Sequence, residues 1–343
     1  MRLANRSTLW LAASLLCISA CDSCGSPAAR DTGTTPEDPH LIVDVFQPTQ
    51  PSEFFPMHVG DRWAYRHGDA LQIRGITALD DRGDAYLFGD GLSRAGRFRL
   101  TAAGIMRVLE GKVLPWLQGP AEAGREWTYV SGDAACMANY TADVQTLQVA
   151  GLSLENCVRV ERSCRLPAGK PFATATLERH EEVYCPSVGL VHQRLSFDPP
   201  PAIEGVEAVQ EDELVNFQVA GAPLPRVHEP FDCESLLLLE SDVQTACGPN
   251  LRRAPQPPST RRAQCERVFE SPEGSLRVRV QQLEMAATDE DLERALARTE
   301  GRFGEKEGRF LILLDPSAAC PRERASRLLP LLHSLVAPAT AEP

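Results

Sequence analysis

Cysteine is the residue type with the greatest potential for chemistry in this chain, which has eleven cysteines among 343 residues. Three lie within the first 24 residues, and the other eight form two sets of four. Such a number is unusual in the cytosol and common in exported proteins, where thiols oxidise to disulfides. Zinc ribbons use pairs of closely spaced cysteines, which neither set contains. The sequence therefore predicts two disulfides in each set and no metal site. The first set is Cys136, Cys157, Cys164 and Cys185, and the second is Cys233, Cys247, Cys265 and Cys320.

Other candidate reactive groups are few. The sequence contains no nucleophile elbow, zinc-protease motif, phosphate loop or dinucleotide fingerprint. His180, Glu181 and Glu182 gather possible metal ligands, but we expect His180 and Glu182 to be exposed polar residues on the solvated face of a strand. Cys320 precedes Pro321 at an expected helix start, where a helix dipole can activate a thiol, so a reactive thiol is the alternative to a disulfide there. We assign no catalytic residue, no metal ligand and no cofactor.

The N-terminus has the architecture of an export signal. Arg2 and Arg6 precede an apolar run that ends in Ile18-Ser19-Ala20-Cys21. This ending resembles the bacterial lipobox, which implies that Cys21 is acylated and becomes the first residue of the mature protein. The alternative is an ordinary secretory signal that is cut after Ala20. Residues 1–20 are thus the expected signal peptide, and residues 21–51, rich in Pro, Gly, Thr and Asp, are the expected flexible tether.

The formal net charge of the chain is −12 at pH 7. Removal of the signal would take away two arginines and no acid, which makes the mature protein more acidic. An acidic surface repels phosphate backbones, so nucleic acid and anionic lipid headgroups are poor candidate partners. No apolar run after residue 20 is long enough to cross a membrane. The expected partners are the membrane that holds the lipid anchor and an unknown envelope protein or small ligand.

Residues 52–222 alternate short β-rich runs with turn residues, and no long helical pattern interrupts them. We predict an antiparallel meander that is curved or partly closed, so that the protein is mainly β. The expected strands are residues 62–67, 71–79, 84–90, 97–101, 104–109, 125–130, 140–149, 152–164, 173–185, 189–197 and 213–219.

A hairpin turn at Ala150-Gly151 would place Cys136 within one residue of Cys164 across two strands, and a bulge would bring them together. This register favours a Cys136–Cys164 disulfide and leaves Cys157 with Cys185. The corresponding register around the next loop does not place Cys157 beside Cys185.

Three segments of this region resemble landmarks of a group of uncharacterised β-rich bacterial lipoproteins. They are FFPMHVGDRWAYR (54–66), VAGLSLENCVRVE (149–161) and VYCPSVGLVHQ (183–193). The resemblance implies a β-rich architecture and an exported location, and it implies no reaction. Trp63 and Tyr65 would share one face of a strand and anchor a core. An aromatic-lined cavity for an apolar ligand is the functional alternative.

After a proline-rich linker (223–230), residues 231–338 are expected to form a small α+β sandwich, followed by a disordered tail (339–343). The expected order is ααββαβα. It begins with two short helices in 231–248, the second opened by a capping box of Ser241 and Gln244. A last helix would start at Pro321. Before it, a helix capped by Thr288 would have one apolar face made of Leu292, Ala295, Leu296, Thr299 and Phe303.

Residues 232–282 open with Cys233-x-x-Leu-Leu, continue with an expected helix that ends at Gly248, and place Cys265 at the head of an expected strand. These features resemble a disulfide-stapled module of secreted bacterial lipoproteins and sensor ectodomains. In that module the early cysteine and the strand cysteine are partners. The resemblance therefore implies the pairs Cys233–Cys265 and Cys247–Cys320.

The sequence as a whole indicates a bacterial lipoprotein of the cell envelope, anchored on the periplasmic side or at the cell surface, with a non-catalytic binding or structural role. One alternative is a carrier that holds an apolar envelope ligand in the β region. The other is a hydrolase or thiol enzyme with dispersed active-site residues.

Overall fold

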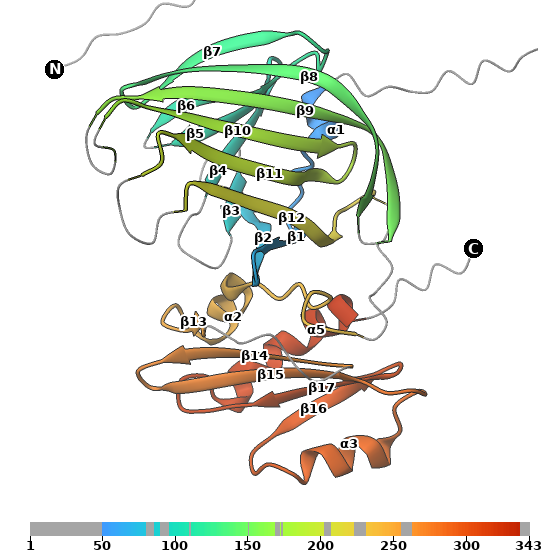
Figure 1. The fold of residues 1–343 in the computed structure, drawn as a ribbon. Helices are drawn as coiled ribbons and strands as arrows, with labels where there is room; N and C mark the ends of the chain where they lie inside the picture. The colour runs from blue at the N-terminus through green and yellow to red at the C-terminus, as the bar shows by residue number, and fades with distance from the viewer. Residues whose placement is uncertain are drawn as a thin grey trace, which may run out of the picture. The chain divides into compact units, whose positions relative to one another are not determined.

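A computed structural model of the chain contains one large and one small antiparallel β-sheet (Figure 1). The structure describes residues 50–79, 86–89, 96–109, 111–149, 151–168, 172, 174–201, 207–222, 231–254 and 263–336. The predicted signal peptide, nearly all of the tether, the linker 223–230 and the tail lie outside these residues.

The large sheet has twelve strands, and its spatial order is β6-β5-β4-β3-β2-β1-β12-β11-β10-β9-β8-β7. Neighbours are antiparallel, as a meander requires, and β1 pairs with β12 to join the first and second halves. The strands are β1 (Arg62–His67), β2 (Ala70–Leu79), β3 (Tyr86–Gly89), β4 (Gly96–Thr101), β5 (Gly104–Leu109), β6 (Lys112–Gln118), β7 (Glu126–Ser131), β8 (Ala134–Val149), β9 (Leu152–Leu166), β10 (Thr176–Cys185), β11 (Gly189–Asp198) and β12 (Val209–Gln218).

The large sheet curves round a core that its two halves share. The short helix α1 (Pro51–Phe54) lies within the curve (Figure 1), and Phe54 packs in one buried cluster with Ile105 of β5 and Tyr184 of β10. Strands β6 and β7 form the two edges, and no ladder of hydrogen bonds joins them in the described chain, so the sheet is open. The prediction of a mainly β protein with a curved antiparallel meander is confirmed.

The long hairpin of β8 and β9 contains the bulge that the cysteine spacing required. Next to the turn, Val149 pairs with Leu152, and the register shifts by one residue between Tyr140 and Asp143. Beyond this shift Cys136 lies opposite Cys164. Because one inserted residue changes which positions face each other, the bulge brings the two cysteines together.

Strand β6 was not predicted from the sequence. Pro115 lies in its middle, and proline cannot donate a ladder hydrogen bond, so the run KVLPWLQ does not look like a strand. The structure tolerates Pro115 because β6 is an edge strand. The first half of β8 was missed as well, since its AACMA run carries little β propensity.

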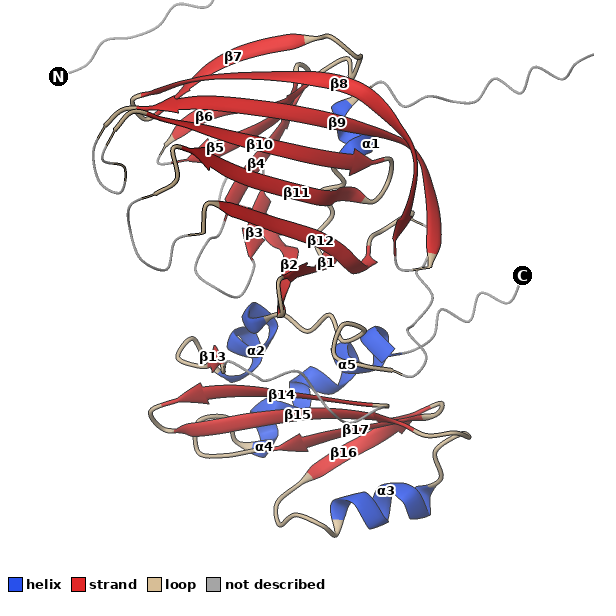
Figure 2. Ribbon diagram, viewed as in Figure 1, coloured by secondary structure: helices blue, strands red, loops and turns tan. Residues whose placement is uncertain are grey.

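The small sheet has the order β13-β14-β15-β17-β16. Helices α2, α4 and α5 cover one face and share a core with Phe269 and Leu276, while α3 packs on the other face against Leu311 and Leu313 (Figure 2). Strand β17 is apolar at consecutive positions because both of its faces are buried. The elements are α2 (Glu240–Cys247), β13 (Arg252–Arg253), β14 (Gln264–Ser271), β15 (Gly274–Gln282), α3 (Asp289–Leu296), β16 (Phe303–Glu307), β17 (Phe310–Asp315), α4 (Arg322–Ala325) and α5 (Leu329–Val336).

Three predicted details of this region are wrong. Residues 231–239 form a turn and an extended segment instead of a helix, and α2 starts at Glu240. The cap is the Asp242 carboxylate, which accepts the Leu239 N–H at 2.9 Å, whereas Ser241 and Gln244 form no capping box. The helix opened by Thr288 ends at Leu296, and Phe303 begins strand β16. Thr288 itself caps α3 as predicted, since its hydroxyl accepts the Asp291 N–H.

The segment that precedes α2 contacts the large sheet. Arg62 of β1 is buried, donates to the Leu237 carbonyl at 2.9 Å and forms an ion pair with Asp242 at 2.5 Å. Leu237 and Leu239 pack in one apolar cluster with Ile73 of β2. None of the helices in the described part of the chain is both long enough and apolar enough to cross a membrane.

Candidate functional site

The inner face of the large sheet encloses a hollow of about 490 Å³, a size typical of small-molecule pockets. Strands from both halves of the sheet line it, together with the residue that follows α1. Its aromatic lining residues are Phe55, Trp63, Tyr65, Phe98, Trp116 and Tyr184. Its charged and titratable lining residues are His67, Arg74, Arg107, Glu178, His180 and Asp212.

Buried hydrogen bonds hold the aromatic side chains in place. The Trp63 indole donates to the Val188 carbonyl at 2.6 Å, and the Tyr65 hydroxyl donates to the Leu190 carbonyl at 2.8 Å. Gly189 lies between these two acceptors with a φ of 98°, a conformation that glycine adopts without strain. The landmark segments 54–66 and 183–193 thus contact each other, and the predicted core role of Trp63 and Tyr65 agrees with their burial.

One wall of the hollow carries a charged cluster. Asp212 of β12 accepts from Arg74 at 2.7 Å and is 2.8 Å from Nδ1 of His67. The Arg74 guanidinium also lies 4.7 Å from the centroid of the Tyr65 ring. On β10, His180 bonds to Glu178. Both carboxylates of the lining therefore already have partners.

A second polar network is buried behind the aromatic lining. Arg162 and Glu182 are fully buried, and Nε of Arg162 donates to Oε2 of Glu182 at 3.0 Å. The same oxygen accepts the Tyr184 hydroxyl at 2.7 Å, and the Trp116 indole donates to that hydroxyl at 3.0 Å. Burial, and then the charge of Glu182, raise the pKa of Tyr184 well above its ordinary value. The network therefore fixes Trp116 and Tyr184, which both line the hollow.

The structure corrects the expectation for His180 and Glu182. They share a face, as predicted, but this face is the inside of the curved sheet, and Glu182 has no exposed surface. Sheet curvature buries residues that the sequence pattern assigned to solvent. Among the described residues no group of three or more His, Cys, Asp and Glu side chains is arranged to hold a metal ion.

All eight cysteines of the two sets are bonded in the structure, in the pairs named from the sequence. The bonds are Cys136–Cys164, Cys157–Cys185, Cys233–Cys265 and Cys247–Cys320. Cys320 is buried and bonded, so thiol chemistry there would first need reduction of this bond. Cys21, the predicted lipid attachment site, lies outside the described residues.

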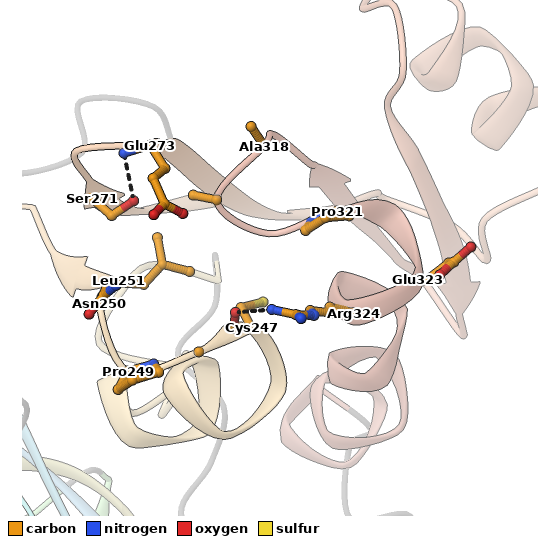
Figure 3. A pocket seen from close by; sticks show the side chains of 12 residues that line it. Cys247, Pro249, Asn250, Leu251, Ser271, Glu273, Ala318, Pro321, Glu323 and Arg324 are labelled. Atoms are coloured by element: carbon orange, nitrogen blue, oxygen red, sulfur yellow. Dashed lines mark hydrogen bonds between the residues drawn. The ribbon is translucent and has the colours of Figure 1, made fainter.

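Two further hollows lie in the region of the small sheet. One, of about 440 Å³, is next to the Cys247–Cys320 bond (Figure 3). There Arg324 donates to the Cys247 carbonyl at 3.3 Å, and Ser271 accepts the Glu273 N–H at 3.2 Å. The first bond joins α4 to the end of α2, and the second lies within the turn between β14 and β15. Neither brings titratable side chains together in this hollow.

The other hollow, of about 460 Å³, is lined by four arginines and Asp315. Arg302 forms a bidentate pair with Asp315, and Arg277 and Arg279 contact Glu266. Most of its positive charge is therefore neutralised within the protein. The hollow of the large sheet is the stronger candidate, because it combines an aromatic lining with charged groups held at defined positions.

No protein-family model matches the chain, and no curated protein matches it. The solved structures that are similar to part of it include the following two. One is described as a putative exported protein with YMCC-like fold from Bacteroides fragilis, and the other as a putative lipoprotein from Parabacteroides distasonis. They are 11% and 12% identical to this chain, and each similarity covers 48% of this chain and 98% of the other, with a TM-score of 0.27. Likenesses this weak support no conclusion about this chain's role.

Sequence reasoning missed Arg107, Trp116 and Arg162 as members of a site. Period-two alternation places Trp63, Tyr65 and His67 on one face of β1, and Glu178, His180 and Glu182 on one face of β10. That signal could have grouped residues within a strand. It could not have brought Arg107 of β5 near β10, because only the curvature of the sheet does so.

Proposed function

We propose that this chain is an exported, membrane-anchored lipoprotein of the cell envelope whose curved sheet binds a small ligand without catalysis. The hollow of the large sheet carries this proposal, because it joins a buried aromatic lining to polar groups at defined positions. The lipobox-like ending at Cys21 supports the anchor. A carrier of an apolar envelope component is the form of this role that fits the lining best.

The charged groups of the hollow include carboxylates that are paired with neighbouring side chains, an arrangement that fits a site that orients a bound ligand. Asp212 is held by Arg74 and His67, and Glu178 is held by His180. A general acid or base must be able to exchange its proton with a substrate. Carboxylates committed to neighbouring side chains instead shape the walls of a site and orient a ligand.

The first test of this role is to fill the hollow. Leu195 lines it from β11, and Leu195→Trp should weaken binding of the neutral apolar dye N-phenyl-1-naphthylamine by about tenfold or more, because the larger ring occupies ligand space. Fluorescence titration measures the effect. Arg194 is exposed on the opposite face of the same strand, so Arg194→Trp is the matched control and should bind the dye like the wild type.

A folded Leu195→Trp protein that binds the dye as tightly as the wild type would contradict a ligand site in this hollow. Thermal unfolding of both tryptophan variants would establish that they are folded.

The anchor has a separate test. Cys21→Ser removes the thiol that would carry the thioether-linked diacylglycerol, so we expect the protein to move from the membrane fraction to the soluble fraction. Intact mass should show acyl chains on the wild type only. A Cys21→Ser protein that stays on the membrane would rule out Cys21 as the anchor.

A further inference from the structure

Arg107 is the one charged lining residue of the large hollow for which no partner of opposite charge is found in the described chain. It lies on β5 opposite Phe98 of β4, and both side chains line the hollow. Its guanidinium lies 5.0 Å from the centroid of the Trp116 ring. Its Nε is buried and has no hydrogen-bond partner among the described residues.

The acid that acts most strongly on Arg107 has two hydrogen-bond donors, both on its Oε2, while its buried Oε1 has none among the described residues. Glu182, the acid that most strongly favours the charged form of Arg107, accepts from Arg162 and from the Tyr184 hydroxyl. Arg162 itself lies 4.2 Å from the Trp116 ring centroid, so two guanidiniums flank one aromatic ring near a single carboxylate. Burial, and in addition the charge of Arg162, lower the pKa of Arg107.

A partly buried guanidinium without a hydrogen-bonded anion is unfavourable, because burial removes water that no protein group replaces. A ligand that brings a carboxylate would supply the missing acceptor. The planar fork of arginine matches a carboxylate in two parallel hydrogen bonds. A single negative charge is sufficient, since Arg162 is already neutralised by Glu182.

Apolar surface lies beside this group. The centroid of the Phe98 ring lies 5.0 Å from that of Phe55, with the two rings tilted, and 6.0 Å from that of Trp116, edge to face. Phe55, Phe98 and Trp116 all line the hollow together with Arg107. A ligand whose head reaches Arg107 would therefore have aromatic surface on which to place an apolar body.

We propose that the hollow binds an amphiphilic carboxylate, with the carboxylate at Arg107 and the apolar body against Phe98, Phe55 and Trp116. This inference rests on the proposed ligand-binding role and names the class of ligand.

Titration calorimetry with three ten-carbon probes tests it. At neutral pH the wild type should bind decanoate about tenfold more tightly than decanol, which has the same chain and no charge, because a hydrogen bond to a charged group contributes about 1.4 kcal/mol or more. Decyltrimethylammonium, with the opposite charge, should bind more weakly than decanol. This comparison needs no variant.

Arg107→Gln should lose the preference, so that decanoate binds about tenfold more weakly while the affinity for decanol changes by less than about twofold. Arg107→Lys keeps the charge without the planar fork and should retain part of the preference. Arg159 is exposed, on the outer face of β9, and Arg159→Gln is the matched control that should bind both probes like the wild type.

Equal affinity of the wild type for decanoate and decanol would overturn the inference while leaving the ligand-binding role standing. An Arg107→Gln protein that still prefers decanoate would overturn it too. If neither decanol nor the neutral dye binds the wild type, the ligand-binding role itself fails.

Discussion

Glu182→Gln should lower the free energy of unfolding by about 3–5 kcal/mol, the cost of leaving a buried charge without its partner. Arg162 is 2% exposed, and its Nε forms an ion pair with Glu182. Its two Nη atoms have no hydrogen-bond partner among the described residues, so Glu182 is the carboxylate that neutralises it there. A glutamine keeps the shape and removes the charge. Urea unfolding measures the change. Glu181 is exposed on the other face of the same strand, so Glu181→Gln should change stability by less than about 0.5 kcal/mol.

A double variant separates the ion pair from the general cost of substitution in the core. Arg162→Met with Glu182→Leu removes both charges and should cost less than the sum of the two single substitutions, because neither partner is then left charged and unpaired. If the double variant lost as much stability as the two single variants together, the buried ion pair would not stabilise the fold. A Glu182→Gln protein as stable as the wild type would show the same.

Removal of the Cys247–Cys320 bond should have the other large effect on stability. It joins positions 73 residues apart, and closing a loop of that length in the unfolded chain corresponds to about 4 kcal/mol. The Cys247→Ser, Cys320→Ser double variant should therefore unfold at markedly lower urea concentration. The Cys136–Cys164 bond spans 28 residues, and its removal should cost somewhat less, about 3.5 kcal/mol.

Peptide mapping without reductant tests the connectivity on which this prediction depends. The expected cross-linked peptides join the four pairs of the structure, and no other pairs. Peptides that link Cys247 to Cys233 or Cys265 would contradict the pairing. A double serine variant as stable as the wild type would contradict the stabilising role of the bond.

The Cys247–Cys320 prediction and the binding prediction concern different parts of the protein. The Cys247–Cys320 bond lies in the region of the small sheet, whereas Arg107 belongs to the large one. Their effects should therefore be independent, since distant substitutions with no shared partner add. Loss of the Cys247–Cys320 bond should leave the preference for decanoate over decanol unchanged at temperatures where the protein stays folded.

The local sequence pattern was sufficient to predict most of the strands and the fold class. Period-two alternation and turn residues predicted β1, β2, β4 and β5 nearly to their ends. The errors were local as well. Strand β6 carries Pro115, and the LLLL run before α2 reads as a helix although it is extended and packs on the large sheet.

The inner and outer faces of the large sheet could not be separated from the sequence. Polar residues at alternate positions look the same whether they face water or a hollow, so His180 and Glu182 were assigned to the solvated face. Glu182 is paired with Arg162 of the neighbouring strand β9 and accepts from the Tyr184 hydroxyl. That hydroxyl in turn accepts from Trp116 of β6, a strand that no spacing along the chain connects to β10.

The sequence by itself determined the alternation of the strands, the cysteines that a single bulge could bring together, and the lipobox-like start, because each depends on neighbouring residues or on the register of one hairpin. Only the tertiary structure decided which faces enclose the hollow and which charges in it lack a partner. Those properties depend on how twelve strands curve, and curvature places Arg107, Trp116, Arg162 and Glu182 together although they belong to four different strands.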